Sequence, residues 1–528
     1  MKKQCPIYIA TILFLCSCID DKGNYTYLSA TDMYPASIAS GIEERYDVKA
    51  GDTLIINPQF ATPVDDSDYT YRWLLMSSGP ADTIGFEKDL HWPVQKGTGI
   101  YTIRLRIKNS RNISIFTPVC RLFVVTEFSV GWFITKERSE GTTDIDMVTP
   151  EGGFIPNVIE MVNGSSMQGK PINTTFTHFY EMIDTTTNRM VLASAFIIAT
   201  HSDIGSFRGD DMTPIFGTNE IFIERPLNID PYDLGYHCNN VVKLSVLIND
   251  GGFHWMPSRS VMNTAGTGGR YTERLLGNYK INRHLCKIYD VDYANMTNQG
   301  LLLIFDDNTN SFKKITTNFM LSAPSIINFS NATLPEGIPN CDNMDYNLVY
   351  MKEYDVNKGL GVMQSKTDGT YYGFRTVNLI PATAYPFDAW VPVPANANVL
   401  TAAVRCTNQN NGTIYSSSGN NEVYAYRIGG RGDASGTESR ILTFAPDEQV
   451  THIEDVEFPA LLLNQLTTGI FRHLVVLTSQ GDNWNMYCYN FIGSSDEIDT
   501  TPVQSYTGKG RAVHAVYRDP NYTVTPYF

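Results

Sequence analysis

The most regular pattern along this chain is a strict alternation of apolar and polar residues over short stretches. Residues 101–108, YTIRLRIK, place their apolar side chains on one side of the backbone and their polar side chains on the other. Residues 69–73, YTYRW, alternate in the same way and put Trp73 on the apolar side. A period of two residues is that of a strand with one face on a core and the other in water. The pattern therefore predicts strands in this part of the chain.

Residues 41–127 carry enough of these stretches for a complete β-sandwich. Apolar runs at residues 54–56 and 122–125 predict further strands, and polar clusters at residues 65–68 and 109–112 predict the turns between strands. Short strands with turns at this spacing, within about 85 residues, fit an immunoglobulin-like sandwich.

From residue 131 onward one pattern recurs: an apolar strand, a turn of Asn, Asp, Gly or Ser, and a second apolar strand. Turns such as Asn249-Asp250-Gly251-Gly252, between two apolar runs, are strong signals of a β-hairpin. The turns are centred on residues 140, 203, 250, 307, 368, 419 and 481. Their spacing of roughly 50 to 60 residues is typical of the blades of a β-propeller.

We therefore predict an all-β protein in which the sandwich is followed by a β-propeller-like domain over residues 128–528. One hairpin for each blade gives seven blades. Closing many short strands into a ring also protects the sheet edges from pairing with other chains. Because the repeats share little sequence identity, a large two-sheet sandwich or several tandem sandwiches is the alternative.

The first 17 residues have the features of a bacterial lipoprotein signal peptide. A short basic start, MKKQ, precedes an apolar run over residues 5–15. That run is too short to span a bilayer, which takes about 20 residues. Residues 15–18, LCSC, resemble a lipobox, in which the last cysteine is acylated and becomes the first residue of the mature chain. We expect the lipid on Cys18 and a polar tether over residues 18–40. An ordinary export signal is the alternative.

Three motifs resemble those of one protein family. They are DKGNY at residues 21–25, YRW at residues 71–73, and GIYTI at residues 99–103, which begins the alternating strand. Together they resemble the PKD-like lipoproteins encoded within Sus-type nutrient-uptake loci. The resemblance implies a SusC/SusD-like TonB-dependent transporter as partner. It also implies that Asp20 and Asp21, directly behind Cys18, are the signal for export to the outer face of the outer membrane. A solvated polar tether is the simpler role of this pair.

Composition narrows the classes of partner. The net charge of the 528-residue chain is −15 and no block of basic residues occurs, which argues against binding to nucleic acid or to anionic lipid.

Beyond Cys18, the mature chain has an even number of cysteines, which permits disulfides in an exported protein. Their apolar surroundings also suit small buried thiols, so the pairing stays open. These cysteines are Cys120, Cys238, Cys286, Cys341, Cys406 and Cys488.

The sequence has no motif that predicts catalysis. It lacks HExxH, the G-x-S-x-G elbow and a phosphate-binding glycine loop, and its nine histidines are scattered without metal-ligand spacing. We therefore expect no catalytic residue, no metal and no cofactor. Paired carboxylates in the mouth of a propeller would serve a glycosidase, however, and sequence does not give the distance between them.

The pattern as a whole favours a non-catalytic, surface-exposed outer-membrane lipoprotein. It would bind a nutrient ligand, the transporter, or both, as an accessory subunit of a SusC/SusD-like complex. The ligand class, glycan or peptide, stays open. Trp255, Trp390 and Trp484 lie in or near blade turns. We expect each of them to pack in the core, and stacking on a ligand is the alternative role. A glycan-cleaving propeller enzyme, hydrolase or lyase, anchored at the cell surface is the alternative function.

Overall fold

The protein divides into two compact units, and each is described by itself. Unit 1 is Met1–Val124 and unit 2 is Val125–Phe528. The structure is a computed structural model, and the residues that it describes are 33–76, 81–184, 188–238, 243–258, 266–288, 299–317, 324–329, 334, 336–355, 357–379, 386–458, 461–462, 465–466, 471–493 and 497–518.

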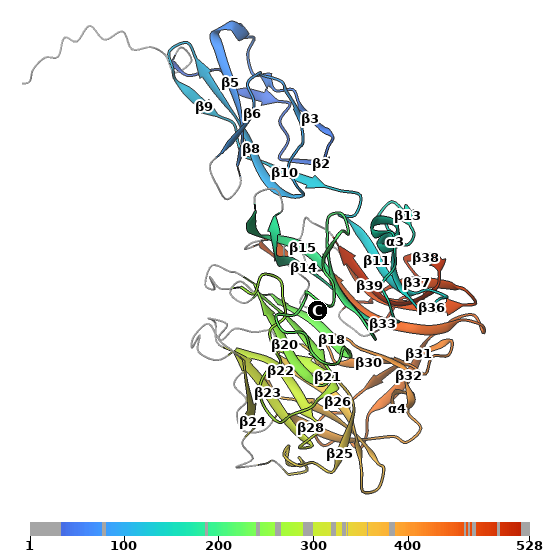
Figure 1. Cartoon of the computed structure of the whole chain (residues 1–528). Helices are drawn as coiled ribbons and strands as arrows, with labels where there is room; N and C mark the ends of the chain where they lie inside the picture. Colours follow the sequence, from blue (N-terminus) through green and yellow to red (C-terminus); the bar gives the residue numbers. More distant parts are fainter. Residues whose placement is uncertain are drawn as a thin grey trace, which may run out of the picture. The chain divides into compact units, whose positions relative to one another are not determined.

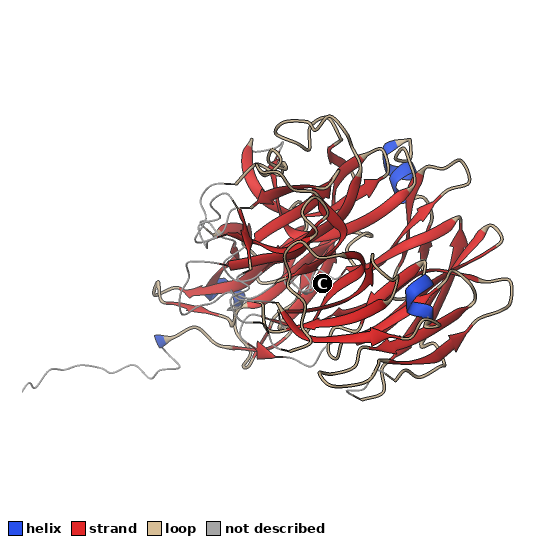
Figure 2. Cartoon of the chain, turned by 90° about the horizontal axis from the view of Figure 1, so that it is seen from below, coloured by secondary structure: helices blue, strands red, loops and turns tan. Residues whose placement is uncertain are grey.

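The chain is all-β, as the alternation predicts. The helices η1 (Asp66–Asp68), α3 (Val158–Asn163) and α4 (Asn398–Thr401) are six residues long or shorter. Figure 2 shows strands and loops nearly everywhere else in the described residues. Within those residues, no helix has the length and the apolar run that a membrane span requires.

Unit 1 contains one large sheet and two strand pairs. The sheet order is β2-β10-β8-β5-β6, with β9 also paired to β8, and the pairs are β1-β4 and β3-β7. The strands are β1 (Ile38–Ser40), β2 (Arg45–Lys49), β3 (Thr53–Ile56), β4 (Gln59–Phe60), β5 (Tyr69–Met76), β6 (Asp82–Gly85), β7 (Leu90–Pro93), β8 (Gly99–Asn109), β9 (Ser114–Phe116) and β10 (Cys120–Val125).

The core of unit 1 confirms the predicted strand faces. Ile103, Leu105 and Ile107 of β8 are fully buried, and so is Trp73 of β5. The indole N–H of Trp73 donates to the backbone carbonyls of Glu87 and Lys88, each at 3.2 Å. Because the indole N–H has acceptors, the largest side chain of this core is buried without an unpaired donor.

Among the described residues, unit 2 has seven sheets of three or four strands, which follow one another along the chain (Figure 1). Six have four strands, and the sheet β18-β19-β20 has three. The strands are β11 (Gly131–Glu137), β12 (Thr143–Val148), β13 (Phe154–Ile155), β14 (Pro171–Asp184), β15 (Arg189–Thr200), β16 (Ile204–Arg208), β17 (Pro214–Phe216), β18 (Pro231–Cys238), β19 (Lys243–Asn249), β20 (Gly252–Pro257), β21 (Ile281–Lys287), β22 (Gln299–Asp306), β23 (Ser311–Thr317), β24 (Ser325–Asn328), β25 (Tyr346–Tyr354), β26 (Lys358–Ser365), β27 (Tyr371–Thr376), β28 (Phe387–Val393), β29 (Val404–Thr407), β30 (Thr413–Ser417), β31 (Glu422–Arg427), β32 (Thr437–Thr443), β33 (Gln449–Phe458), β36 (Phe471–Gln480), β37 (Asn483–Asn490), β38 (Gln504–Lys509) and β39 (Arg511–Arg518); β34 (Leu461–Leu462) and β35 (Gln465–Leu466) form a separate pair.

All seven predicted hairpins are confirmed, one in each sheet. The paired strands are β11 and β12, β15 and β16, β19 and β20, β22 and β23, β26 and β27, β30 and β31, and β36 and β37. In the turn between β19 and β20, Asp250 and Gly251 have φ values of 47° and 69°. Positive φ at both central residues is what a two-residue hairpin turn of type I′ requires, and Asp-Gly satisfies it at low cost.

The last described strand, β39, completes the first sheet of unit 2. Strand β39 pairs antiparallel with β11, for example Phe133 with Val516 (Figure 1). We call β14, β18, β21, β25, β29, β33 and β39 the inner strands. Each inner strand lies against the next one in this order, and β39 lies against β14. The contacts among the inner strands therefore return to their starting point.

Buried polar groups connect residues near the beginning of unit 2 with residues near its end. Asp146 of β12 accepts the indole N–H of Trp484 at 2.8 Å and pairs with the ammonium group of Lys136 at 2.6 Å. Arg518, the last residue of β39, donates to the Phe128 carbonyl at 2.7 Å and pairs with Asp210 at 2.9 Å. Both networks join residues that are more than 300 positions apart.

Among the described residues, no disulfide joins two of the cysteines. Four of them are buried and one is half-buried, so they match the small buried thiols that their apolar surroundings predict; they are Cys120, Cys286, Cys341, Cys406 and Cys488. The side chain of Cys238 lies outside the described residues.

Candidate functional site

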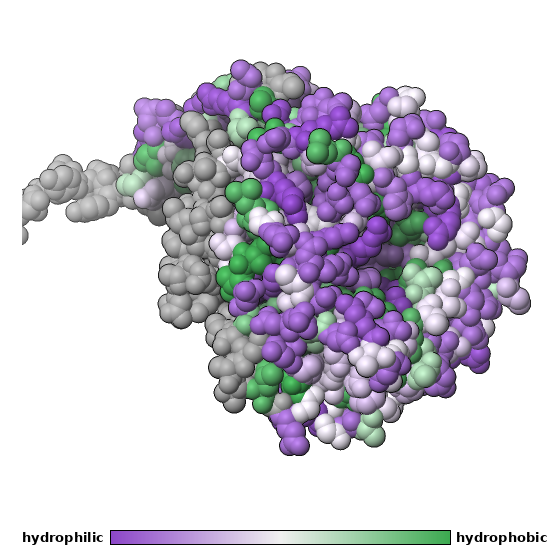
Figure 3. Space-filling view, turned by 60° about the horizontal axis from the view of Figure 1, so that its bottom comes forward, coloured by the Kyte–Doolittle hydropathy of each residue, from purple (hydrophilic) through white to green (hydrophobic). Residues whose placement is uncertain are grey.

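Unit 2 encloses a cavity of about 420 Å³ between its inner strands. Figure 3 shows a largely hydrophilic face of the molecule that is hollowed near its middle. Every inner strand contributes a polar or charged residue to the cavity wall: Asn173, Asp233, His284, Lys352, Arg405, Glu454 and His514. Because these residues come from seven separate parts of the sequence, only the arrangement of the sheets brings them together.

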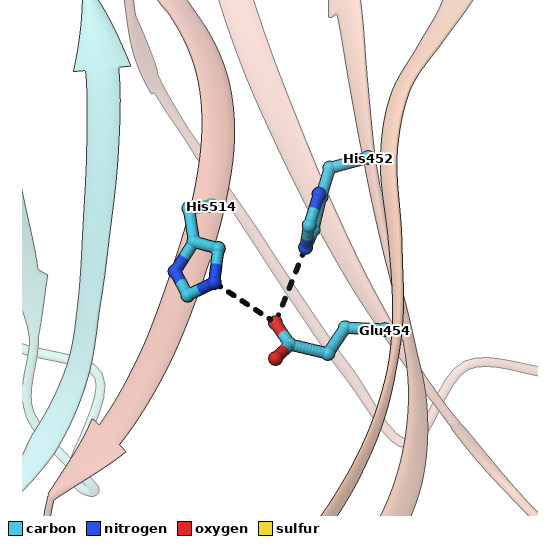
Figure 4. A group of neighbouring side chains, drawn as sticks. All are labelled: His452, Glu454 and His514. Carbon is cyan, nitrogen blue, oxygen red and sulfur yellow. Dashed lines mark hydrogen bonds and ion pairs between the residues drawn. The ribbon is translucent and has the colours of Figure 1, made fainter. Parts of the chain in front are cut away.

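A compact group of two histidines and one glutamate lies in this wall (Figure 4). His452 and Glu454 are two residues apart on β33, so their side chains lie on the same side of the strand. His514 comes from β39, which lies against β33. The Nε2 atoms of His452 and His514 are 3.2 and 3.8 Å from one oxygen, Oε2, of Glu454. We call these three residues the His–Glu–His cluster.

The charge state of the cluster follows from its burial. Burial lowers the pKa of His514 to about 4, although Glu454 nearby raises it. Burial alone would raise the pKa of Glu454, but the contacts with His514 and His452 lower it more, so the net shift is downward. At neutral pH, His514 is therefore an uncharged imidazole and Glu454 is a carboxylate.

A lysine places positive charge in the same cavity. The ammonium group of Lys352 lies 3.6 Å from Glu353, and its side chain is one-third exposed. Burial would lower the pKa of Lys352, but Glu353 and then Asp233 raise it more. The same lysine charge lowers the pKa values of Glu454 and His514. The cavity therefore offers an anionic group of a ligand the ammonium group of Lys352, beside the other cationic side chains of its lining, Arg283, Lys287 and Arg405.

Three other carboxylates of the cavity wall have protein partners. Asp455 is held by the guanidinium of Arg472, with the shorter contact at 2.6 Å, and Asp233 accepts from the Asn173 amide at 3.1 Å. Glu353 accepts from the backbone N–H of Lys287 at 3.0 Å. Each contact links one inner strand to a residue of another strand. These three carboxylates therefore have a structural role, because their contacts hold neighbouring strands of the cavity wall together.

Because of His284, we expect the folded protein to lose a measurable part of its stability in acid. Burial, followed by the positive charge of Arg405, lowers the pKa of His284 to about 4 from an ordinary value of 6.5. Between these two values the unfolded chain binds a proton that the folded chain does not, so stability falls as the pH drops from 6.5 to 4. We expect a loss of about 2 kcal/mol from this residue, less than the full shift implies because the side chain is partly exposed.

The check is urea denaturation of the wild-type chain and of His284→Gln at pH 7 and pH 4.5. The difference between the two pH values should be smaller in the variant. An equal acid sensitivity in both chains would rule out this assignment.

The residues singled out from sequence lie elsewhere. Cys18, Asp20 and Asp21 fall outside the described residues. Trp255 and Trp390 are half-buried against one hydrophobic core, and Trp390 contacts the rings of Tyr346, Tyr372, Phe374 and Phe387. Trp484 is fully buried and bonded to Asp146, which leaves it no surface for stacking on a ligand. None of the three tryptophans lines the cavity.

Sequence reasoning missed the His–Glu–His cluster. The pattern His452-x-Glu454 in a predicted strand is a weak signal, because it places two metal-ligand side chains on one face. The third residue, His514, lies 60 positions further on, and no local spacing connects it to the other two. His514 is placed beside the other two residues because β39 and β33 are neighbours in the fold.

Comparison with known proteins identifies a domain at the N-terminal end. Residues 18–171 match the profile of the PKD-like family, a stretch that covers the described part of unit 1 and continues to the beginning of β14. No curated protein matches the chain.

Two solved structures show only distant likeness. One is a crystal structure of BBS1N in complex with ARL6DN, soaked with lead, with 11% identity and a TM-score of 0.33; the match covers 67% of this chain and 90% of that one. The other is the rhamnogalacturonan lyase YesW, with 12% identity and a TM-score of 0.20 over 82% of this chain and 64% of that one. At such TM-scores neither likeness supports an argument about function.

Proposed function

We propose that this protein is a non-catalytic lipoprotein on the outer face of the outer membrane, where it binds a nutrient for a SusC/SusD-like TonB-dependent transporter. The lipobox-like residues 15–18 and the acidic pair behind them support the anchor and its direction. The PKD-like domain supports an exported, multidomain protein of the type that the sequence motifs indicate. Cys18 would carry the lipid, and the PKD-like unit would follow the tether.

We further propose that unit 2 is a seven-bladed β-propeller. The support is the succession of seven sheets, the hairpin in each of them and the antiparallel pairing of β39 with β11. Strand β39 would then close the ring by completing the first blade. Such closure leaves only short, protected sheet edges, which suits a protein exposed to the outside of the cell.

The observation that carries the binding function is the cavity among the inner strands. Its volume of about 420 Å³ is within the range of small-molecule sites. The wall presents Lys352, the His–Glu–His cluster and other polar side chains to the cavity. Such a wall suits a small polar ligand. A sugar or the end of a short peptide fits this chemistry equally, and we propose the cavity as the site for either.

A glycan-cleaving enzyme is the second candidate, and the observation in its favour is the presence of four carboxylates in the cavity wall: Asp233, Glu353, Glu454 and Asp455. A glycosidase needs two carboxylates that flank the scissile bond and are free to exchange protons. Here Asp455 is neutralised by Arg472 and Glu353 is paired with Lys352. These ion pairs favour binding over acid–base catalysis.

One experiment separates the two functions. The lipidated chain, carrying a C-terminal affinity tag, is isolated from detergent-solubilised outer membranes, and its companions are identified by mass spectrometry. The same preparation is incubated with a panel of glycans and peptides. We expect a TonB-dependent transporter in the isolate and no cleavage of any substrate. Recovery of the protein alone together with cleavage of a glycan would favour the enzyme.

A further inference from the structure

The His–Glu–His cluster has the composition of a metal site. Two imidazoles and one carboxylate are ligands for Zn²⁺ and for other divalent transition metals, whereas Ca²⁺ and Mg²⁺ prefer oxygen ligands throughout. Three protein ligands leave at least one coordination position open in a four-coordinate zinc site. The chemistry of the group therefore fits a transition metal with room for one further ligand.

The distances in the cluster are close to those that such a metal requires. The three ligand atoms lie within 4.8 Å of one another. The two nitrogen–oxygen distances are 3.2 and 3.8 Å. In a tetrahedral zinc site, with bonds of about 2.0–2.1 Å, neighbouring ligand atoms are about 3.3 Å apart. The three atoms therefore lie within about 1.5 Å of the spacing that a bound ion would give them.

The surroundings of the cluster keep it accessible. The side chains of His452, Glu454 and His514 are 22%, 31% and 14% exposed, and all three line the cavity. Figure 4 shows both imidazoles turned toward the same carboxylate oxygen, from two different strands. A purely structural hydrogen-bond group would explain the contacts, but it would not require two nitrogen atoms to converge on one oxygen beside an open space.

We propose that His452, Glu454 and His514 bind one divalent transition-metal ion, with Zn²⁺ as the reference metal, and present its open position to the cavity. Two features are expected to weaken the binding of this metal ion. Lys352 lies in the same wall and repels a cation. The Nδ1 atom of His514 is buried and, among the described residues, has no hydrogen-bond partner. Metal-bound histidines usually donate from this second nitrogen, and losing such a partner weakens binding by about 10- to 100-fold. We therefore expect an exchangeable ion and not a structural one.

The test is metal titration of the mature full-length chain at pH 7. Bound metal is first removed with a chelator, and Zn²⁺ is then added in competition with a chromophoric chelator. We expect one equivalent of Zn²⁺ per chain. His452→Ala, His514→Ala and Glu454→Gln should each weaken binding by more than about 100-fold, because each removes a direct ligand and not only its support. His284→Ala is the matched control, since His284 lines the same cavity without belonging to the cluster, and it should bind as the wild type does.

A second measurement does not depend on the variants folding. Co²⁺ added to the metal-free wild-type chain should give the intense visible bands of a tetrahedral nitrogen–oxygen site, and Zn²⁺ should abolish them. The proposal is overturned if the wild-type chain binds no equivalent of Zn²⁺, if the cluster variants bind as tightly as the wild type, or if His284→Ala loses as much affinity as they do. None of these outcomes depends on whether a transporter is isolated with the protein.

Discussion

Replacing Asp146 with alanine is expected to destabilise unit 2 by about 3–5 kcal/mol. The exposed fractions of Lys136 and Asp146 are 2% and 0%, so the substitution leaves a buried ammonium group without its counter-ion. It also removes the acceptor of the Trp484 indole N–H and of the Asn157 backbone N–H. Because Trp484 belongs to the last sheet of unit 2 and Asp146 to the first, the loss falls on the junction between the ends of the unit.

Urea denaturation followed by tryptophan fluorescence measures this effect. Glu422→Ala is the control, because Glu422 forms an ion pair with Arg440 on an exposed surface of the same unit, and it should shift the midpoint far less. Adding Lys136→Met to Asp146→Ala should recover part of the lost stability, since it removes the stranded charge. If Asp146→Ala behaves like the surface control, the junction is not what holds unit 2 together.

Replacing Cys18 with serine is expected to release the protein from the membrane almost completely. Each acyl methylene contributes about 0.8 kcal/mol of membrane binding, and two or more chains give stable retention. Serine has no thiol to acylate, and the sequence, with a net charge of −15, has no run of basic residues that would hold the chain to anionic lipid. Fractionation of cells, followed by a wash of the membranes at high salt, gives the distribution of the protein.

Cys16→Ser is the matched control, because Cys16 lies two positions earlier in the same segment. This variant should stay in the membrane fraction as the wild type does. Retention of the Cys18→Ser chain after the wash, or equal loss of both variants, would show that the anchor is not a lipid on Cys18.

Local chemistry explains why so much of the fold could be predicted. A hairpin is specified by a few adjacent residues, as in Asn249-Asp250-Gly251-Gly252, and each strand face is specified by alternation within it. The predicted turns and the buried face of β8 therefore agree with the structure. Nothing local specifies which strand completes the first sheet. Strand β39 pairs with β11 across almost 400 residues, and the sequence holds no signal of that pairing.

The same limit applies to the residues of the site. Trp484 follows a polar hairpin turn, so the sequence left both core packing and stacking on a ligand open for its ring. Its partner Asp146 lies 338 residues away, and only the neighbouring sheets reveal that the indole is buried. The His–Glu–His cluster was missed for the corresponding reason, because His514 and Glu454 meet only where two inner strands lie side by side. Side chains that converge from distant strands are beyond what periodicity and spacing predict.

Intact mass spectrometry of the chain purified from its native membranes tests whether this nutrient-binding protein is fixed to the outside of the cell. We expect a mature chain that begins at Cys18 and is heavier than its sequence by the mass of its acyl groups. A chain with an unmodified Cys18, recovered from the soluble periplasmic fraction, would contradict this expectation.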